Sequence, residues 1–216
     1  KKLLAFCTTE NIGIVGMGIG LALIGKGSGN PLISLLGLSA ALLHTLNHSL
    51  YKSLLFFTAG NIYRQTHTRN MEQLGGLIRT MPQTAVLFLG GVLGIAGMPP
   101  FNGFVSKFLV YSGFLESFHT QSVMLSALLI VCAAILAMAG GVSVVAFSKS
   151  FGMIFLGTPR QEKHVTPGEV PALMRIPLFA IVALMLAIGL FPGLLITFMQ
   201  RILTGFMPGT ALQVPA

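Results

Sequence analysis

Five long apolar stretches constrain the fold of this chain more than any other feature of its sequence. They cover residues 3–24, 32–62, 82–118, 123–155 and 176–206. Roughly 20 helical residues cross the hydrocarbon core of a bilayer, and each stretch exceeds that length. With 8% charged residues and a mean hydropathy of +0.85, the chain has too little polar surface for a water-soluble globule. The stretches lack the polar–apolar alternation of barrel strands. The sequence therefore predicts an all-α integral membrane protein, a polytopic helix bundle with five transmembrane helices in a lipid bilayer.

Basic residues gather on one side of the predicted membrane. If the five segments cross in turn, only Lys26 and Arg201 fall on the other side. By the positive-inside rule, the side richer in lysine and arginine is cytoplasmic. We therefore expect the N-terminal end of this chain in the cytoplasm and its C-terminal tail outside. The basic residues on the richer side are Lys1, Lys2, Arg64, Arg69, Arg79, Lys149, Arg160, Lys163 and Arg175.

Several other classes of function fit the sequence poorly. The net charge is +8, but the basic residues are dispersed and are not interleaved with stacking aromatic side chains, so we expect no nucleic-acid binding. Cys7 and Cys132 belong to no metal-ligand spacing and are expected to fill apolar space. We therefore expect no metal and no cofactor in this chain. It begins Lys-Lys-Leu-Leu-Ala, directly in an apolar stretch and without an initiator methionine, which is typical of a piece of a longer protein.

Three titratable residues interrupt the second apolar stretch at helical spacing. His44, His48 and Lys52 lie at roughly 0°, 40° and 80° around a helix and rise about 12 Å along it. An ionisable residue within a membrane costs several kcal/mol and usually marks an ion or proton pathway. Histidine suits proton transfer because its unperturbed pKa lies near neutrality. The alternative is that the histidines only hydrogen-bond neighbouring helices, but such bonds contribute only about 0.6–2 kcal/mol in membranes.

The third stretch contains a helix-breaking sequence. Pro99, Pro100 and Gly103 lie within an apolar run, and two successive prolines remove backbone hydrogen bonds there. Broken helices of this kind recur at the ion sites of transporters. Lys107 follows one turn after the break and is a second candidate for the proton path; if the break is shallow, its side chain would instead extend to the membrane surface.

Two carboxylates are weaker candidates. Glu10 is the one acidic residue in the first two stretches, and its alternative role is an interfacial or helix-contacting one. Glu116 lies near the far membrane surface, where a solvated role competes with one in proton release. We therefore predict a path whose main members are His44, His48, Lys52 and Lys107.

The motifs around these residues resemble those of the antiporter-like subunits of respiratory complex I and of Mrp-type cation antiporters. The resemblance runs in order from Lys1 to Lys107. Within that superfamily, the Glu-Asn-Ile-Gly element is similar to the large membrane subunit of energy-converting nickel–iron hydrogenases of the formate hydrogenlyase and hydrogenase-4 type. The matching strings are Glu10-Asn11-Ile12-Gly13, His44-Thr45-Leu46-Asn47-His48, Tyr51-Lys52-Ser53, Gly75-Gly76-Leu77, Gly97-Met98-Pro99-Pro100 and Gly103-Phe104-Val105-Ser106-Lys107.

The resemblance implies that this chain is the C-terminal part, residues 1–216, of a fourteen-helix antiporter-like domain. Its helices would be the tenth to fourteenth, with the twelfth broken. Lys1 would match the tenth-helix lysine of a buried hydrophilic axis, and Lys107 the twelfth-helix residue near the proton exit. Many hydrogenase subunits carry glutamate at the Lys107 position, so this chain departs from them and agrees with complex I subunits. The glutamate and lysine pair for proton uptake would lie on upstream helices.

Three functions follow as expectations. The first is a non-catalytic, proton- or Na⁺-translocating subunit of a redox-driven complex in a prokaryotic inner membrane. Its partners would be other membrane subunits and a peripheral redox arm that holds the nickel–iron and iron–sulfur centres. The second is an Mrp-like cation/proton antiporter subunit, and the third is a structural scaffold that does not pump. The presence of His44, His48, Lys52 and Lys107 argues against the scaffold. Ionisable residues cost free energy within a membrane, and a subunit that does not pump would gain nothing from them.

Overall fold

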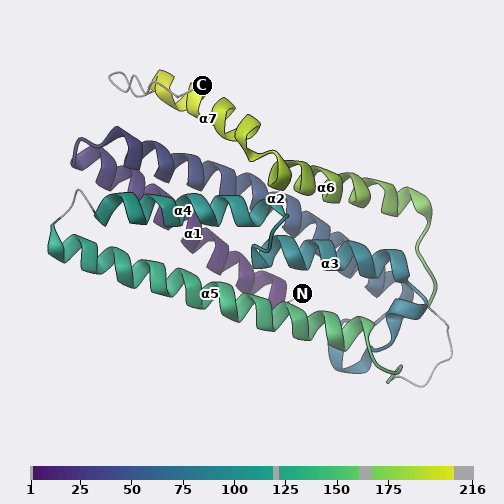
Figure 1. Cartoon of the computed structure of the whole chain (residues 1–216). Coiled ribbons are helices and arrows are strands. Elements are labelled where there is room, and N and C mark those ends of the chain that lie inside the picture. Colours follow the sequence, from purple (N-terminus) through teal and green to yellow (C-terminus); the bar gives the residue numbers. More distant parts are fainter. Residues whose placement is uncertain (1, 119–121, 161–166, 207–216) are drawn as a thin grey trace.

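The computed structural model describes residues 2–118, 122–160 and 167–206, and it is built from helices, with no strand in these ranges (Figure 1). This confirms the predicted all-α class. The elements are α1 (Lys2–Gly27), α2 (Pro31–Thr66), the 3₁₀ turns η1 (Met71–Gln73) and η2 (Leu77–Arg79), α3 (Pro82–Ala96), α4 (Asn102–Phe118), α5 (Val123–Phe155), α6 (Ala172–Leu190) and α7 (Pro192–Phe206).

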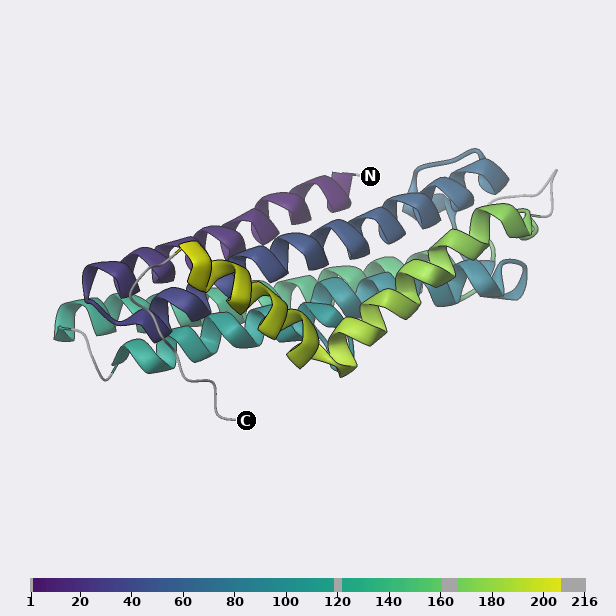
Figure 2. The same ribbon diagram turned by 90° about the horizontal axis from the view of Figure 1, so that it is seen from above.

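Two of the five apolar stretches are divided into two helices each. The stretch 82–118 forms α3 and α4, so the predicted helix break is confirmed. The stretch 176–206 was expected to be one helix, but it bends at Phe191, after which Pro192 starts α7 (Figure 2). Proline explains this division, because it lacks an N–H donor and is tolerated in the first turn of a new helix.

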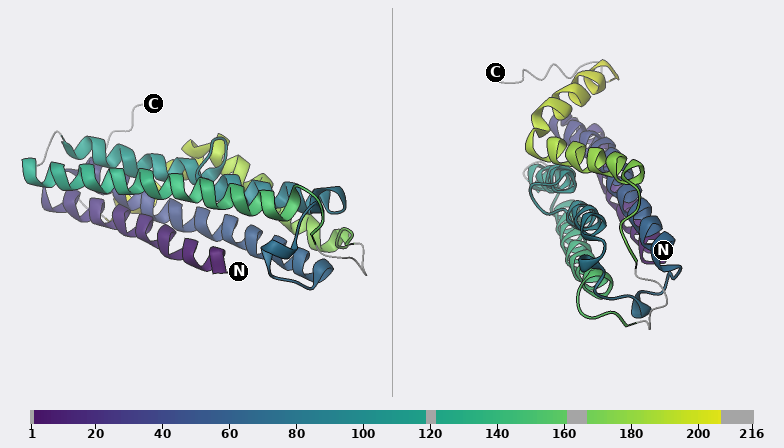
Figure 3. Two further views of the ribbon diagram at one scale, coloured as in Figure 1. Left: turned by 90° about the horizontal axis from the view of Figure 1, so that it is seen from below. Right: turned by 90° about the vertical axis from the view of Figure 1, so that its right-hand side faces the viewer.

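Within the described ranges, three helices are long and apolar enough to cross a membrane by length and composition alone, namely α1, α5 and α6. The 36-residue α2 is longer than any of them, but buried polar residues lower its hydropathy. The half-helices α3 and α4 have 15 and 17 residues, so each by itself is shorter than the roughly 20 residues that cross a bilayer. Seen along the bundle, α1 and α2 lie on one side and α3, α4 and α5 on the other (Figure 3).

Small residues bring α1 and α2 into close contact. A Cβ atom on Gly37 would lie 2.6 Å from the carbonyl oxygen of Gly18, and one on Gly18 would lie 2.9 Å from the carbonyl oxygen of Gly37, so both positions favour glycine. In lipid, helices associate through such close packing rather than through the hydrophobic effect. The turn between them ends at Asn30, whose side-chain oxygen accepts the N–H groups of Leu32 and Ile33 and caps α2.

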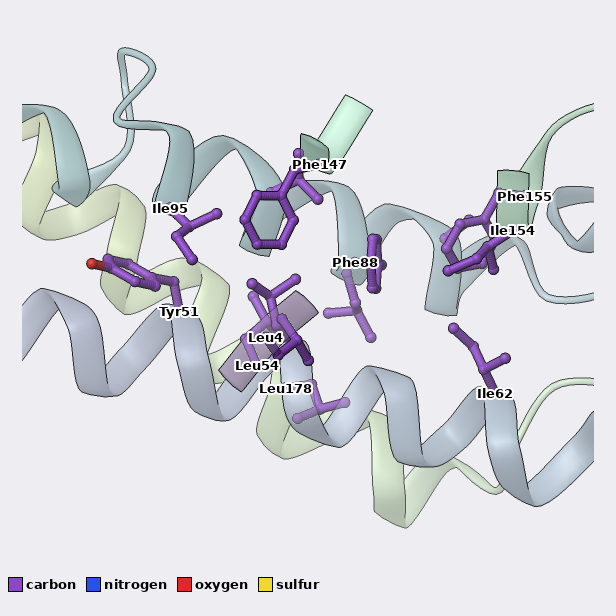
Figure 4. Close-up of a cluster of buried hydrophobic side chains, with 14 of the residues drawn as sticks. Leu4, Tyr51, Leu54, Ile62, Phe88, Ile95, Phe147, Ile154, Phe155 and Leu178 are labelled. Atoms are coloured by element: carbon purple, nitrogen blue, oxygen red, sulfur yellow. The ribbon is translucent and has the colours of Figure 1, made fainter. Parts of the chain in front are cut away.

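A buried apolar cluster fills the space between α2, α3 and α5 near the end of the bundle that holds the loop after α2 (Figure 4). Phe147 and Phe155 of α5 are fully buried in it, and the rings of Phe88 and Phe155 lie 5.5 Å apart. Leu54 on α2 completes the contact from the other side (Figure 4). This cluster holds α2 against α3. It thereby fixes the position of the α2 residues that lie next to the helix break.

A loop carboxylate caps the N-terminus of α3. Glu169, just before α6, accepts the backbone N–H groups of Gln83 at 2.7 Å and Thr84 at 3.0 Å. The Thr84 hydroxyl donates to its second oxygen at 2.9 Å. The first N–H groups of a helix have no partner within the helix and carry partial positive charge. The carboxylate therefore replaces a local cap and ties the start of α6 to the start of α3.

Replacing Glu169 with glutamine should lower the stability of the full-length protein by about 1 kcal/mol, because the charge that faces the helix N-terminus is lost. Thermal unfolding in detergent, followed by circular dichroism, measures the effect. Glu72→Gln is the matched control, since Glu72 is exposed on η1. Equal melting temperatures for the two variants would contradict the capping role.

Candidate proton path

The helix break between α3 and α4 is built from glycine and proline. Gly97 ends α3 in the left-handed conformation, with φ of 76°, and its N–H donates to the carbonyl of Gly94 at 3.1 Å. Pro99 and Pro100 follow, and α4 begins at Asn102. A Cβ atom on Gly103 would collide with the carbonyl oxygen of Gly94. The helix is thus broken at Pro99 and Pro100, and the absence of a side chain on Gly103 allows the two half-helices to touch.

Lys107 lies at the carbonyl end of α3. Its Nζ atom donates to the carbonyl oxygens of Ile95 at 3.2 Å and Ala96 at 3.4 Å. The last carbonyl groups of a helix have no N–H partner within the helix and carry partial negative charge. The broken helix thus supplies a site for a cation within the apolar bundle, and Lys107 fills it.

His44 is fully buried and bridges two other helices. Its Nδ1 atom lies 2.8 Å from the hydroxyl oxygen of Ser106 on α4, and its Nε2 atom lies 3.1 Å from the side-chain oxygen of Asn11 on α1. The Tyr51 hydroxyl donates to the same Asn11 oxygen at 2.6 Å. Both ring nitrogens of the histidine therefore have polar partners, as burial requires.

An asparagine pair joins α2 to the start of α4. Asn47 donates from Nδ2 to the carbonyl of Asn102 at 2.8 Å, and Asn102 donates from Nδ2 to the side-chain oxygen of Asn47 at 3.0 Å. Asn47 also donates to the Ser106 hydroxyl at 3.2 Å. We call the connected side chains the polar network; its members are Asn11, His44, Asn47, Tyr51, Asn102 and Ser106.

His48 and Lys52 lie one and two turns beyond His44 on α2. Lys52 is 6% exposed, and its Nζ atom donates to the carbonyl of Leu4 on α1. The Nε2 atom of His48 is buried without a hydrogen-bond partner among the described residues, and its ring meets the ring of Tyr51 edge-on at 5.6 Å. His44, His48 and Lys52 thus share α2, while the hydrogen bonds of His44 and Lys52 run to other helices.

The two carboxylates lie in different surroundings. Both oxygens of Glu10 lie within 2.8 Å of the Ser143 hydroxyl on α5, and the Cys7 thiol approaches one of them at 3.5 Å. Glu10 therefore joins α1 to α5, next in sequence to Asn11 of the polar network. Glu116 is partly exposed two residues before the end of α4. Lys1 lies outside the described residues.

Sequence reasoning missed the neutral members of the polar network. Asn11, Asn47, Tyr51, Asn102 and Ser106 are all fully or almost fully buried. A signal for two of them was present, because Asn47 and Tyr51 follow His44 by three and seven residues and so share its helix face. Within the described ranges, no group of three or more His, Cys, Asp and Glu side chains is arranged to hold a metal.

The chain is similar in sequence to membrane subunits of hydrogenase, formate hydrogenlyase and antiporter complexes. The chain is 38% identical over 190 residues to hydrogenase-4 component B of Escherichia coli, covering 88% of this chain and 28% of that protein. It is 35% identical over 181 residues to formate hydrogenlyase subunit 3 of the same organism, covering 84% and 30%. It is 34% identical over 202 residues to Na(+)/H(+) antiporter subunit A1 of Staphylococcus haemolyticus, covering 90% and 25%. The chain therefore spans less than a third of the length of these relatives.

Solved structures share the fold. A chain of the Mrp complex from Dietzia superposes with a TM-score of 0.75 at 24% identity, covering 96% of this chain and 42% of that one. A chain of respiratory complex I from Thermus thermophilus superposes with a TM-score of 0.67 at 22% identity, covering 94% and 38%. Residues 1–137 match the family described as the transmembrane part of NADH:quinone oxidoreductase and the Mrp antiporter. This chain belongs to that NADH:quinone oxidoreductase/Mrp antiporter family of membrane proteins.

Proposed function

We propose that this chain is part of the proton-translocating membrane subunit of a redox-driven complex of the hydrogenase or formate hydrogenlyase type. The observation that carries the proposal is His44, fully buried and hydrogen-bonded on both ring nitrogens between α1 and α4, beside a broken helix that holds Lys107. A histidine and a lysine within an apolar membrane bundle are costly and usually mark an ion or proton pathway. The similarity to hydrogenase-4 component B supports the type of complex.

The proposed path runs along the bundle. His48 and Lys52 lie one and two turns beyond His44 on α2, and Lys107 of α4 places its Nζ atom at the break, on the carbonyls of Ile95 and Ala96. Neighbouring members on α2 are about 6 Å apart along the helix axis, a distance that one or two ordered waters bridge. Lys1 would extend the path at the Lys52 end, Glu10 would adjoin it through α1, and Glu116 would lie toward release.

We propose the same orientation and partners as the sequence favours. Arg64, Arg79 and Arg175 lie at or near one end of the bundle, where α2 ends and α3 and α6 begin, while Lys26 lies at the other end (Figure 1). The positive-inside rule makes the first end cytoplasmic in a prokaryotic inner membrane. Other membrane subunits would carry the rest of the path, and a peripheral arm would hold the nickel–iron and iron–sulfur centres.

Replacing Lys52 with alanine tests the path. In proteoliposomes that contain the native complex with the full-length protein, formate or H₂ oxidation should no longer drive proton uptake, because a titratable member is removed; we expect a loss of roughly 10²-fold. A pH-sensitive dye inside the vesicles measures uptake. The matched control is Lys26→Ala, since Lys26 is exposed at the turn between α1 and α2. Wild-type uptake by the Lys52 variant would refute the path.

An antiporter subunit is the second candidate, favoured by the 34% identity to Na(+)/H(+) antiporter subunit A1. The same vesicles separate the two functions. An antiporter moves protons when a Na⁺ gradient is imposed and needs no electron donor, whereas the redox-driven subunit moves them only during turnover. Purified complexes that lack nickel and iron but exchange Na⁺ for protons would establish the antiporter and exclude the redox-driven proposal.

A further inference from the structure

The amide of Asn11 has a fixed orientation. Its Nδ2 group donates to the carbonyl of Cys7, one turn earlier on α1, at 2.7 Å. Its Oδ1 atom is thereby turned toward α2, where the Tyr51 hydroxyl donates to it at 2.6 Å. Asn11 is 1% exposed, so no solvent competes for these groups. The atom that faces His44 is therefore an amide oxygen, which accepts hydrogen bonds and has no hydrogen to donate.

This orientation decides the tautomer of His44. Because Asn11 Oδ1 only accepts, the Nε2 atom of His44, 3.1 Å away, must carry a hydrogen. In the neutral ring, Nδ1 is then the acceptor, and the Ser106 hydroxyl at 2.8 Å donates to it. An amide oxygen is also a far weaker base than imidazole, so the Nε2 hydrogen cannot pass to Asn11. One ring nitrogen is held as a fixed donor, and the other remains free to exchange a proton.

Ser106 can serve both charge states of His44. Its oxygen accepts from Asn47 Nδ2 at 3.2 Å, and its hydrogen has two acceptors within reach, His44 Nδ1 at 2.8 Å and the carbonyl of Gly103 at 3.3 Å. When His44 is neutral, the hydroxyl donates to Nδ1. When His44 is protonated, Nδ1–H donates to the hydroxyl oxygen, and the hydroxyl turns to Gly103. A hydroxyl has one donor and two acceptor sites, so every bond is satisfied in both states.

We propose that His44 gains and loses its translocated proton through the Ser106 hydroxyl on α4, and that Asn11 is the positioning residue that closes the other side of the ring. This inference rests on the proposed function. On loading, the Ser106 O–H bond breaks as the Nδ1–H bond forms, and the serine oxygen takes a replacement proton from a protonated water on the Lys107 side. On unloading, the same bonds form and break in reverse. The neutral and protonated rings differ by one proton, and no other group changes.

The proposal changes the order of the path. His48 lies one turn from His44 on α2, but the Nε2 side of the His44 ring, which faces α1, is closed by Asn11. The proton of His44 therefore crosses from α2 to α4 beside the helix break. His44 gains and loses this proton through Nδ1 alone, so it lies at a side branch of the path. A path that passed protons through the ring would need a partner that exchanges protons at both ring nitrogens.

Ser106→Ala in the native complex tests the relay. Proton uptake in proteoliposomes should fall by roughly 10²-fold, whereas Ser106→Thr, which keeps the hydroxyl, should restore most of it. Ser39→Ala is the matched control, because Ser39 is a buried serine of α2 whose hydroxyl has no hydrogen-bond partner among the described residues. Assembly of each variant is checked by the yield of the intact complex.

The tautomer is measured by ¹⁵N solid-state NMR of the histidine-labelled complex, with the His44 signals assigned by their loss in His44→Gln. Wild type and Ser106→Ala should both show the Nε2–H tautomer, and Asn11→Leu should show a mixture. An Nδ1–H tautomer in the wild type would overturn the proposal. So would wild-type pumping by Ser106→Ala in a complex that His44→Gln inactivates, and in that case the path through His44 would still stand. Wild-type pumping by His44→Gln would instead refute the path itself.

Discussion

Lys107→Gln should abolish proton translocation and leave the complex assembled. The glutamine amide keeps a hydrogen-bond donor for the carbonyls of Ile95 and Ala96, which Lys107 contacts at 3.2 and 3.4 Å. It removes the charge and the exchangeable proton, so uptake in proteoliposomes should fall by roughly 10²-fold or more. The break then keeps its shape without its titratable group. Yield of the intact complex and dye-detected proton uptake are measured on the same preparation.

Two further variants sharpen the result. Lys107→Arg keeps the positive charge, but arginine does not deprotonate in proteins. If Lys107 passes protons, this variant is also inactive; if the lysine supplies only a fixed charge at the end of α3, it pumps. Lys149→Gln is the control, since Lys149 is exposed on α5. Normal pumping by Lys107→Gln would remove Lys107 from the path.

Gly103→Val should prevent the two half-helices from meeting. Even a single Cβ atom at this position would collide with the carbonyl oxygen of Gly94, which is backbone and cannot turn away. Forcing such an atom into a packed site typically costs about 1–3 kcal/mol, and a branched side chain should lie at the upper end of that range. Lys107 lies one turn further along α4, so the shift should also separate it from Ile95 and Ala96.

The effect is measured as the melting temperature of the full-length protein in detergent and as the proton uptake of any complex that assembles. Gly140→Val provides the control, because a Cβ atom on Gly140 of α5 meets no atom within 4 Å. It adds the same side chain to a helix without a collision. If both variants melted at the same temperature and pumped equally, the close contact at Gly103 would be unnecessary for the break.

The titratable residues of the site could be predicted from the sequence. His44, Lys52 and Lys107 stand out because a charge or imidazole within an apolar stretch is costly wherever the neighbouring helices lie. The break was predictable for a similar reason, since Pro99 and Pro100 remove backbone hydrogen bonds in any tertiary context. These inferences need only local chemistry and the bilayer as solvent.

The partners of these residues could not be predicted in the same way. Asn11 lies 33 positions from His44, and Ser106 lies 62 positions from it. Asparagine and serine are mild interruptions of an apolar helix, and nothing in their spacing says which of them will face a histidine on another helix. The bend before α7 was likewise missed, because an apolar stretch of that length is compatible with one continuous helix.

The sequence by itself determined that this chain folds as helices in a membrane, that one helix is broken at Pro99 and Pro100, and that His44, His48, Lys52 and Lys107 are titratable side chains within apolar stretches. Only the tertiary structure decided that the two nitrogens of His44 face different helices, one toward an amide oxygen that closes it and one toward a hydroxyl that can exchange with it. The physical reason is the distance over which each effect acts. The cost of a polar residue in lipid is a property of that residue, whereas a hydrogen bond forms only near 3 Å, and the packing of three helices sets that distance.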